Sequence, residues 1–251
     1  MTRRRRQLVV EKVRLGNRLN ADLQAVCPEL AALSGSIDNR WFLGFLTARK
    51  DLRQLCRLRR NSVLKIKGIG SFYADIIESW QKGARFSAEV EWVGEMIHND
   101  ARRMLELLEQ IGQLGQAIEA LTQRSEMAQR IGSIPGFGII SSAELAGEIG
   151  TLERFAGEAS LALYLGMATL DNSSSSTEGT RRTRHVNQRT RQAMMVAVAR
   201  HLREVPQSQT YYDKKRAEGK KHNQAIRSLG RHLVRVLWKM LTEDRDYEIR
   251  S

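Results

Sequence analysis

The chain has 251 residues, of which 41 are Lys or Arg and 28 are Asp or Glu, so its formal net charge is +13. Hydrophobic residues make up 41% of it and only 3 residues are Pro, which excludes a mainly disordered or fibrous protein. No apolar run reaches the roughly 18 residues of a membrane span, and no signal-peptide region follows the basic residues 3–6. We therefore expect a soluble, cytoplasmic protein.

The excess of positive charge indicates the kind of partner. It concentrates polyanions at the surface, so nucleic acid is the first expected partner. An anionic membrane is the alternative, but it requires a basic helix with a broad apolar face and aromatic anchors, and the basic segments here lie within ordinary core patterns. Cys27 and Cys56 have neither a Cys-x-x-Cys spacing nor a His at ligand spacing, so we expect reduced thiols and no metal site.

The first predicted element is a helix over residues 8–26, because its apolar residues recur at steps of three and four before Pro28 stops the pattern. The chain is therefore expected to open in the middle of a helix. A second, strongly basic helical pattern covers residues 42–63. A glycine turn follows at residues 67–70.

A long helix is predicted over residues 90–121, where apolar residues recur at alternating steps of four and three, as in a coiled-coil seam. Gly112 and Gly115 weaken it by about 1 kcal/mol each relative to Ala. We therefore expect a partner helix, from the same chain or from a second copy, and a homo-oligomer is the expected state.

The second half of the chain continues with helical patterns. The predicted elements are a helix–turn–helix over 131–150 with its turn at 135–138, a short helical stretch over 152–165, a loop over 171–180, and helices over 188–202 and 223–241. Strict alternation of apolar and polar residues never extends beyond a few positions. The predicted fold class is all-α.

Two glycine turns share the pattern apolar-x-Gly-apolar-Gly, at residues 64–70 and 131–138. Such a turn before a helix is typical of a helix-hairpin-helix, in which small residues let backbone N–H groups approach a phosphate. A tight turn that uses Gly only for its positive φ is the alternative. Cations flank the first turn and none flanks the second in sequence. The candidate phosphate-contacting residues are Lys65, Lys67, Gly136 and Gly138.

The loop over residues 171–180 contains four consecutive serines and precedes a basic segment, because no acidic residue occurs from Gly179 to Arg203. A serine hydroxyl becomes a nucleophile only when it is activated, and phosphoryl transfer needs cations around the phosphate oxygens. A Ser-rich surface loop beside a solvated basic face is the alternative. The candidate cations are Arg181, Arg182, Arg184, Arg189 and Arg191.

A third basic region covers residues 211–239. Cations recur every four residues on the predicted helix, and no acidic residue occurs between Lys220 and Thr242, so a stripe that follows a phosphate backbone is favoured over a solvated face. The candidates are Lys214, Lys215, Arg216, Lys220, Lys221, Arg227, Arg231 and Arg235. Tyr211 is interpreted as a packing anchor, with a base-stacking ring or a recombination nucleophile as alternatives.

Six motifs, taken in order, closely resemble the C-terminal half of bacterial insertion-sequence transposases of the IS110 family. They lie at residues 134–138, 143–150, 154–155, 164–167, 171–175 and 212–222. The resemblance implies a bacterial DNA recombinase with an N-terminal RuvC-like domain, which carries four acidic metal ligands, and a C-terminal transposase domain with a catalytic serine. It also implies a guide RNA. We expect a helical connecting region with a coiled-coil arm at residues 1–129 and the transposase domain at residues 130–251.

The resemblance makes Ser174 the best match to the nucleophile and Ser173 the second choice. Ser175 stands where the family has Gly, so a turn with positive φ there would be strained by roughly 1 kcal/mol or more. None of the four acidic ligands can be placed on this sequence, so the Mg²⁺ of the family is expected on a missing domain and no cofactor on this chain. We expect a truncated transposase that binds DNA or structured RNA and does not transpose alone.

Two other functions stay open. One is a non-catalytic nucleic-acid-binding module derived from a transposase, which would show salt-dependent binding and no cleavage. The other is a helical ribosome-associated or repair protein that uses the two glycine turns and prefers ribosomal RNA or branched DNA.

Overall fold

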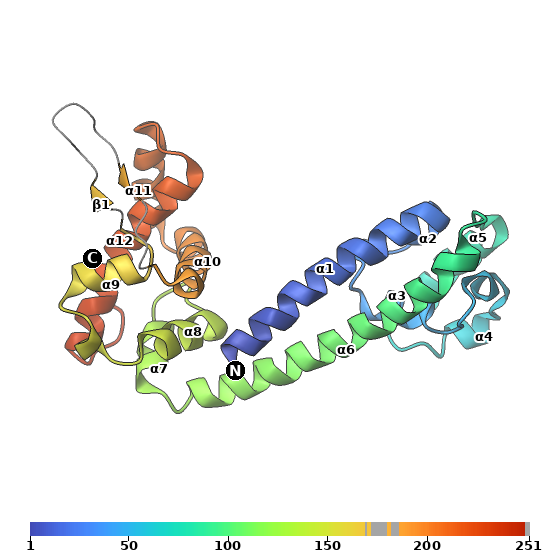
Figure 1. Cartoon of the computed structure of the whole chain (residues 1–251), viewed down its shortest axis with the longest axis horizontal. Helices are drawn as coiled ribbons and strands as arrows, with labels where there is room; N and C mark the ends of the chain where they lie inside the picture. The colour runs from blue at the N-terminus through green and yellow to red at the C-terminus, as the bar shows by residue number, and fades with distance from the viewer. Residues whose placement is uncertain (169, 172–179, 182–185, 249–251) are drawn as a thin grey trace. The chain divides into compact units, whose positions relative to one another are not determined.

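The computed structural model describes residues 1–168, 170–171, 180–181 and 186–248. Helices dominate this part of the chain (Figure 1), and its strands are the two-residue segments β1 (Leu170–Asp171) and β2 (Thr180–Arg181). The two strands are antiparallel, with Leu170 opposite Arg181. The predicted all-α class is confirmed. Within the described residues, no helix has both the length and the apolar character that crossing a membrane requires.

Contacts divide the chain into two compact units. The first unit is Arg3–Leu114, and the second, called here the C-terminal unit, is Gly115–Ser251 with Met1–Thr2. This boundary lies within a single helix, and the predicted division between residues 1–129 and 130–251 stays a prediction.

The helices up to this boundary follow one another closely. They are α1 (Thr2–Val26), α2 (Pro28–Ala31), α3 (Arg40–Leu46), the 3-10 helix η1 (Leu52–Arg57), α4 (Arg60–Val63), α5 (Ser71–Gly83) and α6 (Val90–Thr122). Both α1 and α6 confirm the helices predicted from apolar periodicity. The partner that α6 was expected to need is α1: Leu15 and Leu19 of α1 share a buried core with Ile97 of α6.

The predicted helix over residues 42–63 is wrong, because α3 ends at Leu46 and separate turns follow. Thr47 bonds its hydroxyl back to the carbonyl of Leu43 at 2.9 Å. The carboxylate of Asp51 then accepts the backbone N–H of Arg53 at 2.9 Å and caps η1. Such side-chain bonds to the backbone compete with helix continuation, whereas apolar periodicity does not register them.

The C-terminal unit contains α7 (Glu126–Gly132), α8 (Ile139–Ile149), the 3-10 helix η2 (Leu152–Arg154), α9 (Glu158–Tyr164), α10 (Gln188–Glu204), α11 (Pro206–Ala217) and α12 (His222–Thr242). Its core is formed largely by α8, α10 and α12, for example by Leu145, Val198 and Leu237, which are fully buried. The predicted helices over 188–202 and 223–241 correspond to α10 and α12. Helix α11 was not predicted.

Candidate nucleic-acid interface

The two glycine turns have the same local backbone geometry. The first glycine of each has a positive φ, 90° at Gly68 and 83° at Gly136. The next residue is buried and donates its backbone N–H to the carbonyl three positions earlier, at 3.1 Å in the first turn and 3.0 Å in the second. The second glycine of each is the N-cap of the following helix, α5 or α8. The pattern therefore produces one helix-joining turn in each unit.

The surroundings of the second turn differ from the sequence-based expectation. A Cβ on Gly136 would lie 2.2 Å from the backbone nitrogen of His201, so α10 packs directly on this glycine. The buried ring of His201 donates from Nδ1 to the carbonyl of Pro135 at 2.8 Å. A guanidinium nitrogen of Arg200 lies 3.3 Å from the position of a Cβ on Gly138. The turn thus has a neighbouring cation that its own sequence lacks.

The first turn carries its cations on itself. Lys65 and Lys67 are exposed, and neither forms an ion pair with another residue that the structure describes. Gly68 faces the side chain of Trp41, whose Cβ would be 3.2 Å from a Cβ on this glycine. Both lysines are therefore available to a polyanion in solution.

The serine loop lies mostly outside the described residues. This applies to Ser173 and Ser174, and also to Arg182 and Arg184. The backbone of Arg181 is described as part of β2.

Arg189 lies in a network between α8, α9 and α10. Its Nε and Nη2 donate to the buried carboxylate of Glu148 at 2.7 and 3.2 Å. Asn187, the N-cap of α10, donates to the same carboxylate at 2.7 Å and to the hydroxyl of Tyr164 at 2.8 Å. The hydrogen bond from Arg189 to Glu148 raises the pKa of the guanidinium. Arg189 therefore joins helices here, and Arg191 packs its aliphatic part on Gly166.

Glu148, Asn187 and Tyr164 were not predicted as site residues, although Glu148 and Tyr164 lie within two of the six motifs. A signal was present for one of them, because Glu144 and Glu148 are the acidic residues of a helix whose other members are apolar or Ser, and both are buried. A buried acid on such a face needs a partner, which here comes from another helix.

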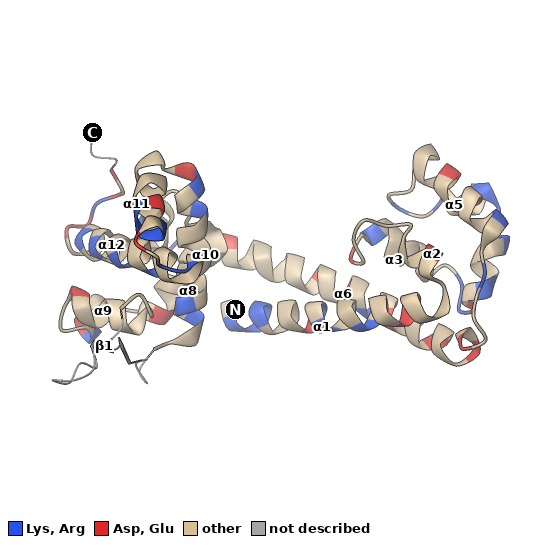
Figure 2. Cartoon of the chain, turned by 90° about the horizontal axis from the view of Figure 1, so that it is seen from above, with Lys and Arg blue, Asp and Glu red and all other residues tan. Residues whose placement is uncertain are grey.

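A pocket of about 510 Å³ lies between α11 and α12 and the chain that follows α9. We call it the basic pocket, since five cations line it: Lys215, Lys220, Arg227, Arg231 and Arg235. The rest of its wall is formed by Met167, Ala168, Tyr211, Gln224, Ser228 and His232. Figure 2 shows the blue Lys and Arg positions on both helices. The predicted stripe on α12 thus forms one wall of a cavity.

Acidic residues partly balance these cations. Glu158 of α9 forms ion pairs with Arg231 and, at 3.7 Å, with Arg235. Glu218 accepts from Lys215 at 2.8 Å. Lys220 and Arg227 form no ion pair within the described part of the chain, so the pocket keeps a positive excess.

The environment of the pocket lowers the pKa of two of its side chains. Burial lowers the pKa of the Arg231 guanidinium, and the nearby Arg235 lowers it further. Burial also lowers the pKa of His232, assisted by Arg235, Lys215 and Arg231. A neutral imidazole is therefore favoured at neutral pH, and its Nε2 lies 2.9 Å from the hydroxyl of Tyr211.

The remaining predicted cations lie outside the basic pocket. Lys214, Arg216 and Lys221 are exposed, and Arg216 donates to the carbonyl of Lys220 at 2.7 Å. Within the described ranges, no three His, Cys, Asp or Glu side chains gather into a possible metal site.

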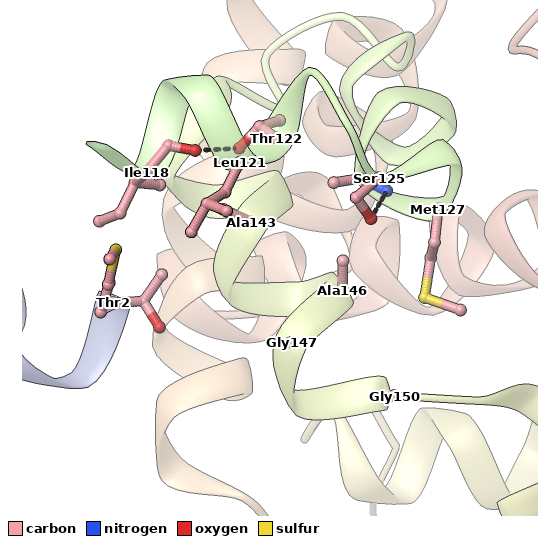
Figure 3. Close-up of a pocket in the computed structure, with 12 residues that line it drawn as sticks. Thr2, Ile118, Leu121, Thr122, Ser125, Met127, Ala143, Ala146, Gly147 and Gly150 are labelled. Carbon is pink, nitrogen blue, oxygen red and sulfur yellow. Dashed lines mark hydrogen bonds between the residues drawn. The ribbon is translucent and has the colours of Figure 1, made fainter. Parts of the chain in front are cut away.

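A second pocket of the C-terminal unit has a different character. Figure 3 shows it where the end of α6 meets α7 and α8, with Ile118, Leu121, Met127 and Ala146 in its wall. The hydroxyl of Thr122 donates a hydrogen bond to the carbonyl of Ile118 at 2.8 Å. Its largely apolar wall makes it a poor match for a polyanion, so the basic pocket is the better candidate.

Comparisons with known proteins show a similarity of this unit to insertion-element transposases. Residues 128–213 match the model of the transposase family IS116/IS110/IS902. The 42 kDa protein of insertion element IS900 from Mycobacterium paratuberculosis is 37% identical over 149 residues, which cover 59% of this chain and 37% of that protein. The 44.8 kDa protein of IS116 from Streptomyces clavuligerus is 28% identical, covering 98% of this chain and 63% of that protein.

The 43.6 kDa protein of IS110 from Streptomyces coelicolor is also 28% identical, covering 97% of this chain and 62% of the relative. The chain therefore spans less than two thirds of the length of these relatives. The chain is similar to proteins that insertion elements encode. More narrowly, residues 128–213 are similar to the transposase domain of the IS116/IS110/IS902 family, which confirms the resemblance seen in the motifs.

Proposed function

We propose that this chain acts in DNA transposition by an insertion element and contacts DNA through the basic pocket. The observation that carries the proposal is the cation-lined cavity in a unit that matches a transposase family. Ala168 lies in the wall of this pocket, and β1 and the serine loop follow it in the chain. DNA held in the pocket would therefore lie near the start of that loop.

In the proposed reaction, the hydroxyl oxygen of Ser174 attacks a phosphodiester phosphorus. The bond from phosphorus to one deoxyribose oxygen breaks, and this oxygen leaves as an alcohol after it takes up the proton released by the serine. The DNA stays attached through a phosphoserine link. Ser173 is the second choice, and Arg181 and Arg184 are proposed to stabilise the charge on the phosphate oxygens.

Mg²⁺ and a guide RNA belong to the proposal only through the family resemblance. The described residues offer no group of three acidic, His or Cys ligands, so the proposed steps assign no role to a metal ion. A guide RNA would be a second polyanion for which the exposed Lys65 and Lys67 are suitable contacts.

Self-association is also proposed. Val10 and Val13 lie three positions apart on α1, and their exposed fractions are 44% and 53%. Residues at this spacing share a helix face, which favours contact with a second copy. Sedimentation equilibrium tests this, since Val10→Glu/Val13→Glu should lower the measured mass, and a monomeric wild type would contradict it.

The experiment that tests the function joins the chain to the N-terminal part of a full-length relative, mixes this protein with labelled insertion-element DNA and Mg²⁺, and looks for a covalent protein–DNA adduct on a denaturing gel. The proposal predicts an adduct for the wild type and for Ser173→Ala, and none for Ser174→Ala. An adduct that persists in Ser174→Ala contradicts the assignment of the nucleophile. DNA binding without any adduct in the wild type indicates a non-catalytic binding module.

A further inference from the structure

We propose that the basic pocket holds an unpaired nucleotide of a nucleic-acid strand. The inference rests on the proposed function, because it assumes that nucleic acid is the ligand. It goes further by naming the form of nucleic acid, a strand separated from its complement. Four properties of the pocket carry it, namely its cations, its ring-bearing wall, its polar groups and its size.

The cations account for a phosphate. Lys220 and Arg227 line the pocket and form no ion pair with another described residue, so both can contact an anionic ligand. Arg227 donates its Nε to the carbonyl of Asn223 at 3.2 Å, which holds the side chain along α12. A planar guanidinium held in this way can bond two phosphate oxygens at once.

Another part of the wall presents aromatic rings and a thioether, which a phosphate alone does not require. It includes Met167, Tyr211 and His232, and the two rings meet edge to face with centroids 4.7 Å apart. Lys215 lies 5.5 Å from the centre of the Tyr211 ring, so this ring combines an apolar surface with a cation. Aromatic rings next to cations are typical of sites that stack single-stranded bases.

Polar groups for the base edge are also present. Gln224 accepts the backbone N–H of Lys221 with its Oε1 at 2.9 Å, which leaves its Nε2 as a donor. Ser228 donates its hydroxyl to the carbonyl of Gln224 at 3.0 Å, so its oxygen remains an acceptor. A donor and an acceptor side by side match the edge of an unpaired base.

The size of the pocket favours a nucleotide over a duplex. Its volume of about 510 Å³ is that of a small-ligand site, and it is concave. In a duplex the bases are stacked and paired, so a cavity of this kind could reach only the backbone. An unpaired nucleotide can place its phosphate on the cations and its base against the rings.

The test compares ligands and variants of the full chain by fluorescence anisotropy. The probes are labelled single-stranded DNA, single-stranded RNA and blunt duplex DNA of equal length. The variants are Arg227→Gln for the cations and Tyr211→Leu for the ring, and Tyr211→Phe keeps the ring but loses the hydroxyl. Arg203→Gln is the matched control, because Arg203 is exposed on α10 and does not line the pocket.

We expect Tyr211→Leu to weaken binding of a single strand about tenfold and binding of the duplex much less, since only an unpaired base loses its stacking partner. Arg227→Gln should weaken the single strand by more than Arg203→Gln does. Tyr211→Phe should bind like the wild type. A loss confined to the DNA or to the RNA strand supports the inference and identifies which strand enters the pocket.

Two results would overturn the inference. In the first, Tyr211→Leu weakens the binding of duplex and single strand equally while circular dichroism shows an intact fold. In the second, Arg227→Gln and Tyr211→Leu bind single-stranded DNA and single-stranded RNA as tightly as the wild type does. In either case the proposed function survives if the wild type still binds DNA. If the wild type binds none of the three probes, the proposed function fails as well.

Discussion

Gly136 shows how one residue type determines a local structure. Its φ of 83° is in the left-handed region, and the backbone of α10 occupies the space where a side chain would start. Gly68 repeats the positive φ, but a Cβ there would approach only Trp41, whose Cβ would lie 3.2 Å away. The glycine pattern therefore specifies the same turn twice, whereas only the second turn depends on close packing by another helix.

Replacement of Gly136 by Ala should destabilise the C-terminal unit by at least about 2 kcal/mol, because the new Cβ combines an unfavourable φ with a clash against α10. Gly147→Ala is the control in α8, where nothing lies within 4 Å of a Cβ, and it should stabilise the helix by about 0.5–1 kcal/mol. Urea denaturation followed by circular dichroism measures both. Equal stability of Gly136→Ala and the wild type would contradict the packing described.

The buried ring of His201 predicts a pH dependence of stability. Burial lowers its pKa from the ordinary value of 6.5, so the native ring resists protonation while the unfolded chain takes up a proton as the pH falls through about 6.5. The free energy of unfolding should therefore fall below that pH, by at most about 1.4 kcal/mol per pH unit from this group.

The comparison is with His201→Gln, whose amide can still donate to the carbonyl of Pro135. Its free energy of unfolding should depend less on pH between 7.5 and 5.5 than that of the wild type. At pH 7.5 both side chains are neutral, so the difference there measures packing alone. An unchanged pH dependence in the variant would rule out His201 as its source.

At the scale of elements, Glu148 connects three helices. Its carboxylate on α8 receives Arg189 and Asn187 at the start of α10, and its backbone carbonyl accepts the hydroxyl of Tyr164 on α9 at 3.0 Å. Buried polar networks of this kind fix the relative placement of helices when every member has a partner. Arg189, a predicted nucleic-acid contact, thus has a structural partner.

A double-mutant cycle with Glu148→Gln and Arg189→Gln should give a coupling free energy of about 1–2 kcal/mol, because the carboxylate is buried. The pair Lys239 and Glu243, which is exposed on both sides, is the control and should give less than about 0.5 kcal/mol. Urea denaturation of each variant provides the values. Additive effects at Glu148 and Arg189 would show that the ion pair contributes no coupling.

How much of the fold the sequence predicts depends on the kind of element. The α6 helix is predicted almost to its ends because its apolar residues recur regularly. Helix α11 was not predicted because it has no apolar face, although Pro206 in its first turn and Gly219 just beyond its end are typical boundary signals. The prediction of one helix over residues 42–63 is wrong because local hydrogen bonds end α3 and start η1, although the apolar pattern continues.

At the scale of the whole molecule, the sequence indicates the chemistry of the basic pocket but not its shape. The stripe of Arg227, Arg231 and Arg235 follows from helical spacing alone. The rest of the pocket wall includes Tyr211 and Met167. The acidic partner of the stripe, Glu158, lies more than sixty positions earlier in the chain. Contacts between elements so far apart in the chain cannot be derived from periodicity, so the cavity emerges only in the folded structure.

The central claim is that the basic pocket is the contact with nucleic acid, and the salt dependence of DNA affinity tests it most directly. The dissociation constant is measured over a range of salt concentrations for the wild type, for Lys220→Gln/Arg227→Gln, and for the charge-matched control Arg203→Gln/Lys239→Gln outside the pocket. We expect the slope of log Kd against log salt to fall by about 1–2 in the pocket variant and hardly to change in the control. Equal slopes for all three proteins would contradict it.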